Sequence, residues 1–381
     1  MPALWPGLTS AAASAIVPRM NSTIALLKQC MAFQPVSDRL DNVNRLVAFL
    51  NSYLKKAGVY TRVETLQGRK ILYAATRATQ LPAILFSAHL DVVPATDAEF
   101  KIREKSGWLW GRGSADCLGH CALLAELLIA LKGQADVGVI FATDEEIGGL
   151  TTRAMVEKGY RGKLAVIVDT NQPNRELCVA QKGICTIKLT AAGKACHGST
   201  PWLGDNAIDR LIEGYVKVKS LFPAVKPGRE WKNTCSANII NAGTVFNRIP
   251  DHAEMVLDIR HTEITTPVRL LRDLRKISGL KAECIQTSPV VFCDAQHPVL
   301  KQFAQFMSRH LGHPVPISRM NGATDARHFS ALKVPIAILG AWGENIHGAG
   351  ERVNINSLLE HQRMLVALCQ TGLPALDACR S

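Results

Sequence analysis

Short apolar runs that read as buried strands alternate with helical segments through the first 180 residues. Strand-like runs at 83–87, 137–142 and 164–168 are separated by helical patterns at 122–131 and 151–158. Such alternation is typical of a sheet with helices on both faces, because each helix that connects two parallel strands packs on one face of the sheet. The pattern therefore predicts an α/β fold.

The pattern of the sequence changes near residue 181. From there to residue 286 it reads strand, helix, strand, strand, helix, strand, which suggests a small α+β domain inserted into the larger one. We therefore predict a larger domain formed by residues 1–180 and 287–381, and an inserted domain at 181–286. Residues 1–20 are small and apolar but lack a basic start. We expect a disordered tail there, or a true start at Met20, rather than a secretory signal.

The composition is that of an ordinary globular chain of 381 residues, 47% hydrophobic and 20% charged. No apolar run approaches the roughly 20 residues that span a bilayer, so no membrane association is expected. The eleven cysteines form no CxxC pair, which indicates reduced thiols and a cytoplasmic protein. The net charge of +12 is spread along the chain and aromatic residues are only 6%. We therefore expect no nucleic-acid binding, and at most a modest attraction for anionic substrates.

A series of ionisable residues falls where the predicted strands give way to loops. The series comprises His89, Asp91, Asp116, Glu145, Glu146, Asp169 and His347. Open α/β sheets bind their ligands at this edge. A cluster of carboxylates at strand ends is costly unless a cation neutralises it, so the series predicts a metal site. Two histidines with several carboxylates suit a borderline cation such as zinc.

Each member of the series also has a simpler interpretation when it is taken alone. His89 and Asp91 could form a satisfied polar pair, and Asp116 could cap the following helix. The adjacent Glu145 and Glu146 could belong to a solvated acidic loop. The metal is favoured by the series as a whole.

The spacing also predicts separate roles for these residues. Residues two apart in an extended chain face the same side, so Asp91 is expected to hydrogen-bond to His89 from behind and fix its tautomer. Adjacent carboxylates repel each other, and a metal relieves the repulsion if Glu146 binds it while Glu145 stays free as a general base. Two metals about 3.5–4 Å apart need one shared carboxylate, and we choose Asp116 for that bridge.

Three segments, Ser87–Pro94, Gly111–Asp116 and Asp144–Gly148, together resemble those of the co-catalytic zinc amidohydrolase and peptidase family. That family includes acetylornithine deacetylase, succinyl-diaminopimelate desuccinylase, aminoacylase and the glutamate carboxypeptidases. The resemblance runs from about residue 32 to residue 368. It implies a zinc-peptidase type catalytic domain with a mixed sheet, and a lid and dimerisation role for the inserted domain. It also implies two divalent metal ions, zinc first, with cobalt or manganese as alternatives.

The family pattern implies how the ligands divide between the two metals. His89 and Asp169 would bind one metal, and Glu146 and His347 the other, with Asp116 between them. The first glutamate of the adjacent pair would be the general base.

The segment Gly193–Ser199 matches the histidine motif of the family's lid domain. In relatives that histidine reaches the active site of the partner subunit and helps to stabilise the oxyanion. The resemblance therefore implies this role for His197, and a homodimer formed through the lid. The substrate-binding positions that it implies are Asn247, Arg260, Thr324 and Arg327. Either arginine could grip a substrate carboxylate bidentately.

Two positions depart from the family pattern. Relatives usually carry a lysine between the bridging aspartate and the next glycine, whereas Leu118 precedes Gly119 here. The deacetylase branch usually reads Glu-Pro-Thr at the fourth carboxylate. If Gln172 occupied the place of that glutamate, one metal site would lose an anionic ligand. Asp169 is preferred because it directly ends a predicted strand.

These observations predict hydrolysis of the amide bond of a small N-acylated amino acid, with acetylornithine deacetylase-like activity first. Desuccinylase-like or other acyl-amino-acid deacylase activity, and di- or carboxypeptidase activity, remain as alternatives. A catalytically silent relative that acts as a binding protein is the alternative from another class. The intact Glu145–Glu146 pair argues against it, because a silent relative has no need of a general base beside metal ligands.

Overall fold

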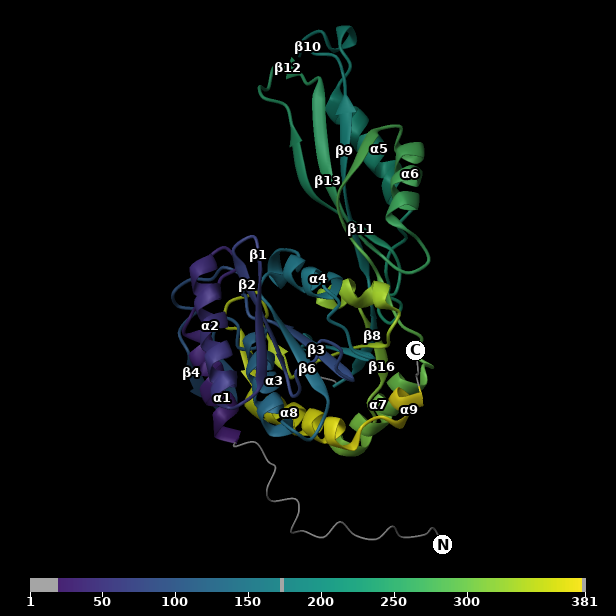
Figure 1. Ribbon diagram of the computed structural model, residues 1–381. Coiled ribbons are helices and arrows are strands. Elements are labelled where there is room, and N and C mark those ends of the chain that lie inside the picture. Colours follow the sequence, from purple (N-terminus) through teal and green to yellow (C-terminus); the bar gives the residue numbers. More distant parts are fainter. Residues whose placement is uncertain (1–19, 172–174, 379–381) are drawn as a thin grey trace. The chain divides into compact units, whose positions relative to one another are not determined.

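The computed structural model describes residues 20–171 and 175–378, which form two compact units (Figure 1). The first unit comprises Met1–Val179, Cys293–Ser318 and Thr324–Ser381, and the second unit comprises Ala180–Phe292 and Arg319–Ala323. The tail expected at residues 1–20 lies outside the described residues, except for Met20. Among the described residues, no helix has both the length and the apolar composition of a membrane span.

The largest sheet is mixed and has nine strands, most of which belong to the first unit. The strand order is β1-β2-β6-β3-β7-β17-β8-β15, and β16 pairs with β8. The bounds are Tyr60–Leu66 (β1), Arg69–Ala75 (β2), Ile84–His89 (β3), Val137–Ala142 (β6), Leu164–Val168 (β7), Leu177–Gln181 (β8), Val291–Phe292 (β15), Ile317–Met320 (β16) and Ile336–Leu339 (β17). β3 is parallel to β6 and β7, and β17 is parallel to β7, whereas the pairs β1–β2, β2–β6 and β17–β8 are antiparallel. The predicted mixed α/β sheet is confirmed.

The centre of this sheet is buried on both faces. Every residue of β3, β6, β7 and β17 is buried, and most of these residues are aliphatic or aromatic. Parallel strands with this composition need helices on both sides. Continuous apolar runs of this kind are the reason that the strands could be recognised from the sequence.

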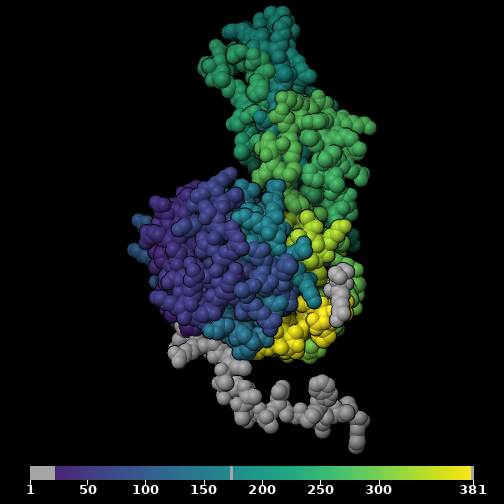
Figure 2. All heavy atoms as spheres, in the orientation of Figure 1, coloured from purple at the N-terminus to yellow at the C-terminus, as the bar shows by residue number. Residues whose placement is uncertain are grey.

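Helices of the first unit cover the sheet and one another. Their bounds are Met20–Met31 (α1), Leu40–Lys56 (α2), Leu118–Leu131 (α3), Leu150–Glu157 (α4), Pro298–Leu311 (α7), Ile355–Thr371 (α8) and Pro374–Ala378 (α9). α2 buries a stripe of aliphatic residues against β1 and β2, and these residues recur at a spacing of three to four along the helix. α3 is buried almost all round, because α1 and α8 pack on it from outside. Figure 2 shows the purple and blue N-terminal part and the yellow C-terminal part of this unit sharing one surface.

A second, four-stranded sheet in the first unit has the order β18-β19-β5-β4. Its strands are Arg103–Lys105 (β4), Trp108–Trp110 (β5), Gly343–Glu344 (β18) and Arg352–Asn354 (β19). The Arg352 guanidinium lies 4.5 Å and 4.4 Å from the ring centroids of Trp108 and Trp110. These pairings bring the chain near residue 110 next to the loop between β18 and β19, which carries His347.

The second unit is an antiparallel sheet, β11-β13-β9-β14, on which two helices pack. Its main elements are Gly183–Ala192 (β9), Ala207–Lys219 (α5), Thr234–Ala242 (β11), His252–His261 (β13), Pro267–Ser278 (α6) and Lys281–Ser288 (β14). Alternate residues of β9 and β13 are buried against the helices, which gives the order strand, helix, strand, strand, helix, strand expected from the sequence. Two short strands, Cys196–His197 (β10) and Arg248–Ile249 (β12), pair beside this sheet.

The unit boundaries differ slightly from the predicted ones. The expected boundary after residue 286 falls inside β14, and the second unit continues to Phe292 and also takes in Arg319–Ala323. The end of β14 carries exposed polar residues, which read as a loop in the sequence. The lid and dimerisation role of this unit stays a prediction.

Candidate active site

Three neighbouring parallel strands of the first unit end at one edge of the sheet with ionisable residues. β3 ends at His89, β7 is followed by Asp169, and β6 leads into a short 3₁₀ turn, Glu145–Ile147. β3 pairs with both β6 and β7, so these strand ends are adjacent. This is the edge at which open α/β sheets hold their ligands.

Asp116 lies between the two histidines of the series. Its Oδ1 atom is 2.9 Å from His89 Nε2, and its Oδ2 atom is 3.2 Å from His347 Nε2. His347 Nε2 is also 3.0 Å from a carboxylate oxygen of Glu146, and His89 Nε2 is 3.6 Å from Asp169 Oδ1. The structure therefore brings all five predicted ligands together, with one oxygen of Asp116 facing each half of the cluster.

The chain around Asp116 is bent by Gly111 and Gly113, whose φ angles are 134° and 83°. The peptide bond from Asp116 to Cys117 is cis. Asp116 does not cap α3, because the N-cap of that helix is Cys117, and its side chain makes no capping hydrogen bond. The helix-cap interpretation of Asp116 is therefore excluded.

The donor atoms have the spacing that a zinc site requires. Tetrahedral ligands at about 2.0–2.1 Å from zinc lie about 3.3 Å from one another. The contacts among the five residues run from 2.9 to 3.6 Å. Two groups of donor atoms in the described residues could each hold an ion: His89 with Asp116 and Glu146, and His89 with Cys117 and Asp169.

The electrostatics of the cluster also favour a cation. Burial raises the pKa of Glu146 and of Asp169, so ionisation of these carboxylates is costly. Hydrogen bonds with Asp116 and Glu146 raise the pKa of His347 to about 10. Burial opposes ionisation of Asp116, but hydrogen bonds with His347 and His89 lower its pKa. These pKa shifts show that burial opposes ionisation of the carboxylates in the cluster, whereas nearby positive charge, which divalent cations would supply, favours it.

Asp91 holds the site together from behind. His89 Nδ1 is 2.9 Å from the backbone oxygen of Asp91 and 3.4 Å from its carboxylate, so the closer contact is through the backbone rather than the predicted side chain. Either partner leaves Nε2 facing the cluster. The Asp91 carboxylate accepts hydrogen bonds from the backbone N–H groups of Glu145 and Glu146, at 3.1 and 3.3 Å, and from the Ser37 hydroxyl at 2.7 Å.

Glu145 is buried beside the cluster. Its side chain is 12% exposed and that of Glu146 is 6% exposed, so the interpretation of this pair as a solvated loop is excluded. Burial and the nearby Asp325 and Asp169 raise the pKa of Glu145. One of its carboxylate oxygens is 3.4 Å from the guanidinium of Arg327.

Thr324 and Arg327 make contacts within the first unit. The Thr324 hydroxyl accepts a hydrogen bond from Ala326 N at 3.2 Å and caps the turn that follows. The Arg327 guanidinium is buried and lies 3.3 Å from Asp325 Oδ1 as well as beside Glu145. Substrate binding by both residues stays a prediction.

Sequence reasoning missed two carboxylates that organise the site. Asp325 contacts Arg327 and the Thr152 hydroxyl. Glu351 accepts hydrogen bonds from the backbone of Ala115 and Asp116, at 3.0 and 3.1 Å, and forms a buried ion pair with Arg112 at 2.6 Å. Two signals were available in the sequence: Glu351 ends the glycine-rich loop that contains His347, and Asp325 lies between Thr324 and Arg327.

Leu118 and Gln172 are the two positions that depart from the family pattern, and the structure describes only the first of them. Leu118 is fully buried and packs at the start of α3, where a Cβ atom on Gly113 would lie 2.7 Å from its side chain. Leu118 therefore serves the core. Gln172 lies outside the described residues.

Three predicted residues belong to the second unit. His197 in β10 is exposed, and its Nδ1 is 2.7 Å from the Ser199 hydroxyl. The backbone oxygen of Asn247 accepts a hydrogen bond from Gly198 N at 2.7 Å, so Asn247 and the histidine loop are adjacent. Arg260 in β13 forms a bidentate ion pair with Asp258, at 2.9 and 3.0 Å. The part that these three residues play at the carboxylate cluster stays a prediction.

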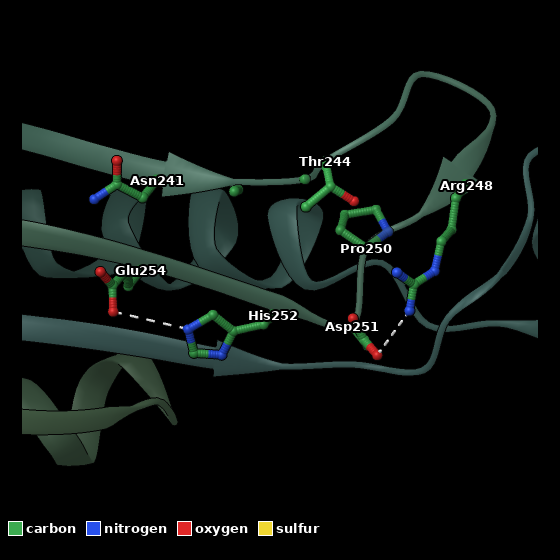
Figure 3. Close-up of a pocket in the computed structure, with 9 residues that line it drawn as sticks. Asn241, Thr244, Arg248, Pro250, Asp251, His252 and Glu254 are labelled. Carbon is green, nitrogen blue, oxygen red and sulfur yellow. Dashed lines mark hydrogen bonds and ion pairs between the residues drawn. The ribbon is translucent and has the colours of Figure 1, made fainter.

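A pocket of about 280 Å³ lies close to the histidine loop, where β11 ends and β13 begins (Figure 3). Arg248 points toward Asp251 at 3.2 Å, and His252 points toward Glu254 at 3.7 Å. The charged side chains that line this pocket are therefore paired with each other within the second unit.

The chain belongs to Peptidase family M20/M25/M40, whose pattern matches residues 85–371. The predicted family is therefore confirmed. A probable succinyl-diaminopimelate desuccinylase from Staphylococcus aureus is 30% identical over 216 residues, which are 47% of this chain and 54% of that protein. The chain thus spans about half the length of this relative. A succinyl-diaminopimelate desuccinylase from Rhodospirillum centenum is 28% identical over 316 residues, which are 77% of this chain and 81% of that protein.

A solved structure shows the same fold. A tripeptidase from Staphylococcus aureus superposes with a TM-score of 0.79 over 95% of this chain and 100% of its own, at 18% sequence identity. At that identity the likeness extends to the architecture alone.

Proposed function

We propose that this protein hydrolyses the amide bond of a small N-acylated amino acid with the help of two divalent metal ions. The observation that carries the proposal is the position of Asp116, whose two oxygens face His89 and His347 separately, at 2.9 and 3.2 Å. A carboxylate placed in this way between two imidazoles fits a bridge between two metals.

Five residues would hold the metals. His89 and Asp169 would bind one ion, Glu146 and His347 the other, and Asp116 would bind both. Zinc fits this set of imidazole and carboxylate donors best, with cobalt or manganese as alternatives. When bound, such ions polarise the substrate carbonyl and lower the pKa of water.

Glu145 would be the general base. It would accept a proton from the attacking water at its carboxylate and later deliver that proton to the leaving amine nitrogen. Hydrogen bonds from the Glu145 and Glu146 backbone to Asp91 hold this turn in place. The adjacent Arg327 guanidinium limits how far the Glu145 side chain can swing.

Residues of the second unit would complete the site in a homodimer. His197 would donate to the oxyanion in the active site of the partner subunit. Asn247 and Arg260, together with Thr324 and Arg327 of the first unit, would position the substrate. The ion pairs of Arg260 with Asp258 and of Arg327 with Asp325 would each have to be shared with a substrate carboxylate.

The acyl group is the finer part of the proposal. Acetylornithine deacetylase-like activity came first from the sequence, whereas the curated relatives described above are named for succinyl-diaminopimelate. We therefore propose an N-acyl amino acid as the substrate class. The test panel would contain N-acetylornithine, N-succinyl-diaminopimelate and several dipeptides.

The metal assignment is tested with Asp116→Asn. The amide would weaken the shared ligand of both ions, so we expect the metal content to fall from two ions per chain to one or fewer. Elemental analysis of the purified protein measures this directly. Asp209→Asn, an exposed change in α5, is the matched control and should keep two ions. Full metal content in Asp116→Asn would remove the bridge from the proposal.

The general base is tested with Glu145→Gln. Turnover on the best substrate of the panel should fall by roughly 10²- to 10⁴-fold while the metal content stays at two ions, because the amide cannot accept the proton. Unchanged turnover would refute the role of Glu145. A wild-type protein that binds metal but cleaves nothing in the panel would favour the silent-relative alternative.

A further inference from the structure

The Arg319 side chain in the second unit lies against two aromatic rings. Its guanidinium carbon is 5.2 Å from the ring centroid of Trp231 and 5.5 Å from that of Phe292. The Trp231 ring is fixed in turn, because its Nε1–H donates to a Glu263 carboxylate oxygen at 2.9 Å. Contacts of this kind orient a guanidinium but use none of its N–H donors.

Among the residues that the structure describes, those donors have no partner. Across residues 20–171 and 175–378, no hydrogen bond or ion pair of the Arg319 side chain with another residue is found, although the other arginines treated above each face a carboxylate. An oriented guanidinium with free donors is ready to receive an oxyanion, because the side-chain entropy of holding it has already been lost.

Arg319 lines a hollow of about 370 Å³ that is formed within the second unit alone. The other side chains that line it are those of Arg229, Glu230, Trp231, Lys232 and Asn321. Three cationic side chains thus face one carboxylate. One oxygen of that carboxylate already accepts a hydrogen bond from Gly228 N at 2.7 Å.

The wall of this hollow is held from behind by a buried lysine. Lys182 is 2% exposed, and its ammonium group donates to the backbone oxygen of Glu230 at 2.7 Å. This contact fixes the loop that carries Trp231, and it adds a fourth positive charge close to the hollow. The arrangement is therefore an open, electropositive hollow with an aromatic wall, and most of its lining side chains are exposed.

We propose that this hollow, the Arg319 pocket, binds a small organic oxyanion. The charged end, a carboxylate or a phosphate, would meet the N–H edge of Arg319, since the guanidinium fork matches either group bidentately. The carbon part of the ligand would lie on the Trp231 ring, and Asn321 would contribute an amide at the rim. The proposal stands apart from the proposed hydrolysis, because none of these residues belongs to the metal cluster.

The test is calorimetric titration of the full-length, metal-loaded protein with succinate, with inorganic phosphate and with neutral succinamide. We expect saturable binding of at least one of the two anions and none of succinamide at the same concentrations. Arg319→Gln should weaken that binding at least tenfold. The control, Arg272→Gln, removes a surface arginine of α6 whose side chain is 72% exposed, and it should bind as the wild type does.

The same variants distinguish anion binding at the metals from anion binding at the Arg319 pocket. A component due to the metals persists in Arg319→Gln, so the difference between the two isotherms reports the pocket. Lys232→Met, a change at an exposed position, is a second variant of the pocket, and it should also lower the affinity for the anion. Succinate and phosphate serve as separate arms that identify the preferred oxyanion.

A local signal comes from tryptophan fluorescence. Anion addition should change the emission of the wild type, and this change should be lost in Trp231→Phe. Identical isotherms for wild type and Arg319→Gln would overturn the proposal, and so would succinamide binding as tightly as succinate.

Discussion

His361 lies in α8 and is completely buried, with its Nδ1 atom 3.0 Å from the backbone oxygen of Ser357. Burial lowers the pKa of this histidine to about 4, from an ordinary value of 6.5. The folded protein therefore holds the neutral ring. A histidine of this kind contributes stability above the pKa of the unfolded chain, and that contribution is lost as the pH falls toward the folded value.

The pH dependence of stability should reveal this residue. Between pH 7 and pH 4.5, the free energy of unfolding of the wild type should fall by roughly 2 kcal/mol more than that of His361→Gln, because only the wild type must charge a buried ring. Chemical denaturation at the two pH values measures the difference. His252→Gln, whose side chain is 61% exposed in the wild type, should follow the wild type. Equal losses in wild type and His361→Gln would contradict the prediction.

At the residue scale, the sequence predicted the residues of the carboxylate and histidine cluster better than the residues that support them. His89, Asp116 and Glu146 could be recognised because strand ends and glycines mark their positions. Asp325 and Glu351 could not, because their partners are distant in the sequence: Asp325 meets Thr152 across 173 residues, and Glu351 meets Asp116 across 235. No local pattern records a contact of that range.

Gly149 joins the Glu145 turn to α4. Its φ angle is 67°, and a Cβ atom added there would lie 1.9 Å from Asp325 Oδ1 and 2.7 Å from His328 Nε2. Gly279 ends α6 with a φ angle of 69°, and a Cβ atom there would meet nothing within 4 Å. The two glycines share a backbone conformation and differ in what surrounds them.

This pair gives a matched prediction for the turn that carries Glu145, the proposed general base. Gly279→Ala should cost about 1–2 kcal/mol of stability and leave turnover unchanged, since only the left-handed backbone is strained. Gly149→Ala carries the same strain and must also displace Asp325, which contacts Arg327 beside Glu145. We expect its kcat to fall at least tenfold with the metal content unchanged. Equal kcat values in the two variants would contradict this expectation.

Elements with a clear period were predictable, and short ones were not. α2 and the central strands β3, β6 and β7 carry long apolar patterns, and the structure contains them. The sheet of β4, β5, β18 and β19 was not foreseen, because strands of two or three residues are too short to show a period. That small sheet positions the loop with His347, so this proposed metal ligand could be named from the sequence while its structural support could not.

The second unit has an edge strand, β11, whose outer side pairs with no other strand of the described residues. In the part of the chain that the structure describes, β11 pairs with β13 alone, and most of it is exposed, including Ile239 and Ile240 at 53% and 55%. An exposed apolar edge strand is a template for pairing with another chain. This feature supports the homodimer proposed above.

Light scattering after size-exclusion chromatography tests the dimer. The chain has a mass of 41.5 kDa, so two copies have a mass of 2 × 41.5 = 83 kDa, and we expect the wild type to show the larger value. The double variant Ile239→Lys/Ile240→Lys should show the smaller one, because charges on the edge oppose pairing. Leu81→Lys, at a 55% exposed position in the first unit, is the control and should remain a dimer. A monomeric wild type at micromolar concentration would contradict the homodimer.

The strand order of the large sheet has a consequence for how the protein is made. β17 lies between β7 and β8, yet it follows both by more than 150 residues in the chain. During synthesis the first half of the sheet therefore emerges with an open edge on β7, and such edges are where incomplete chains associate wrongly. His347 follows β17 closely. The strand that fills this gap in the sheet and the last of the proposed metal ligands thus leave the ribosome almost together, so the proposed metal site would be complete only after that point.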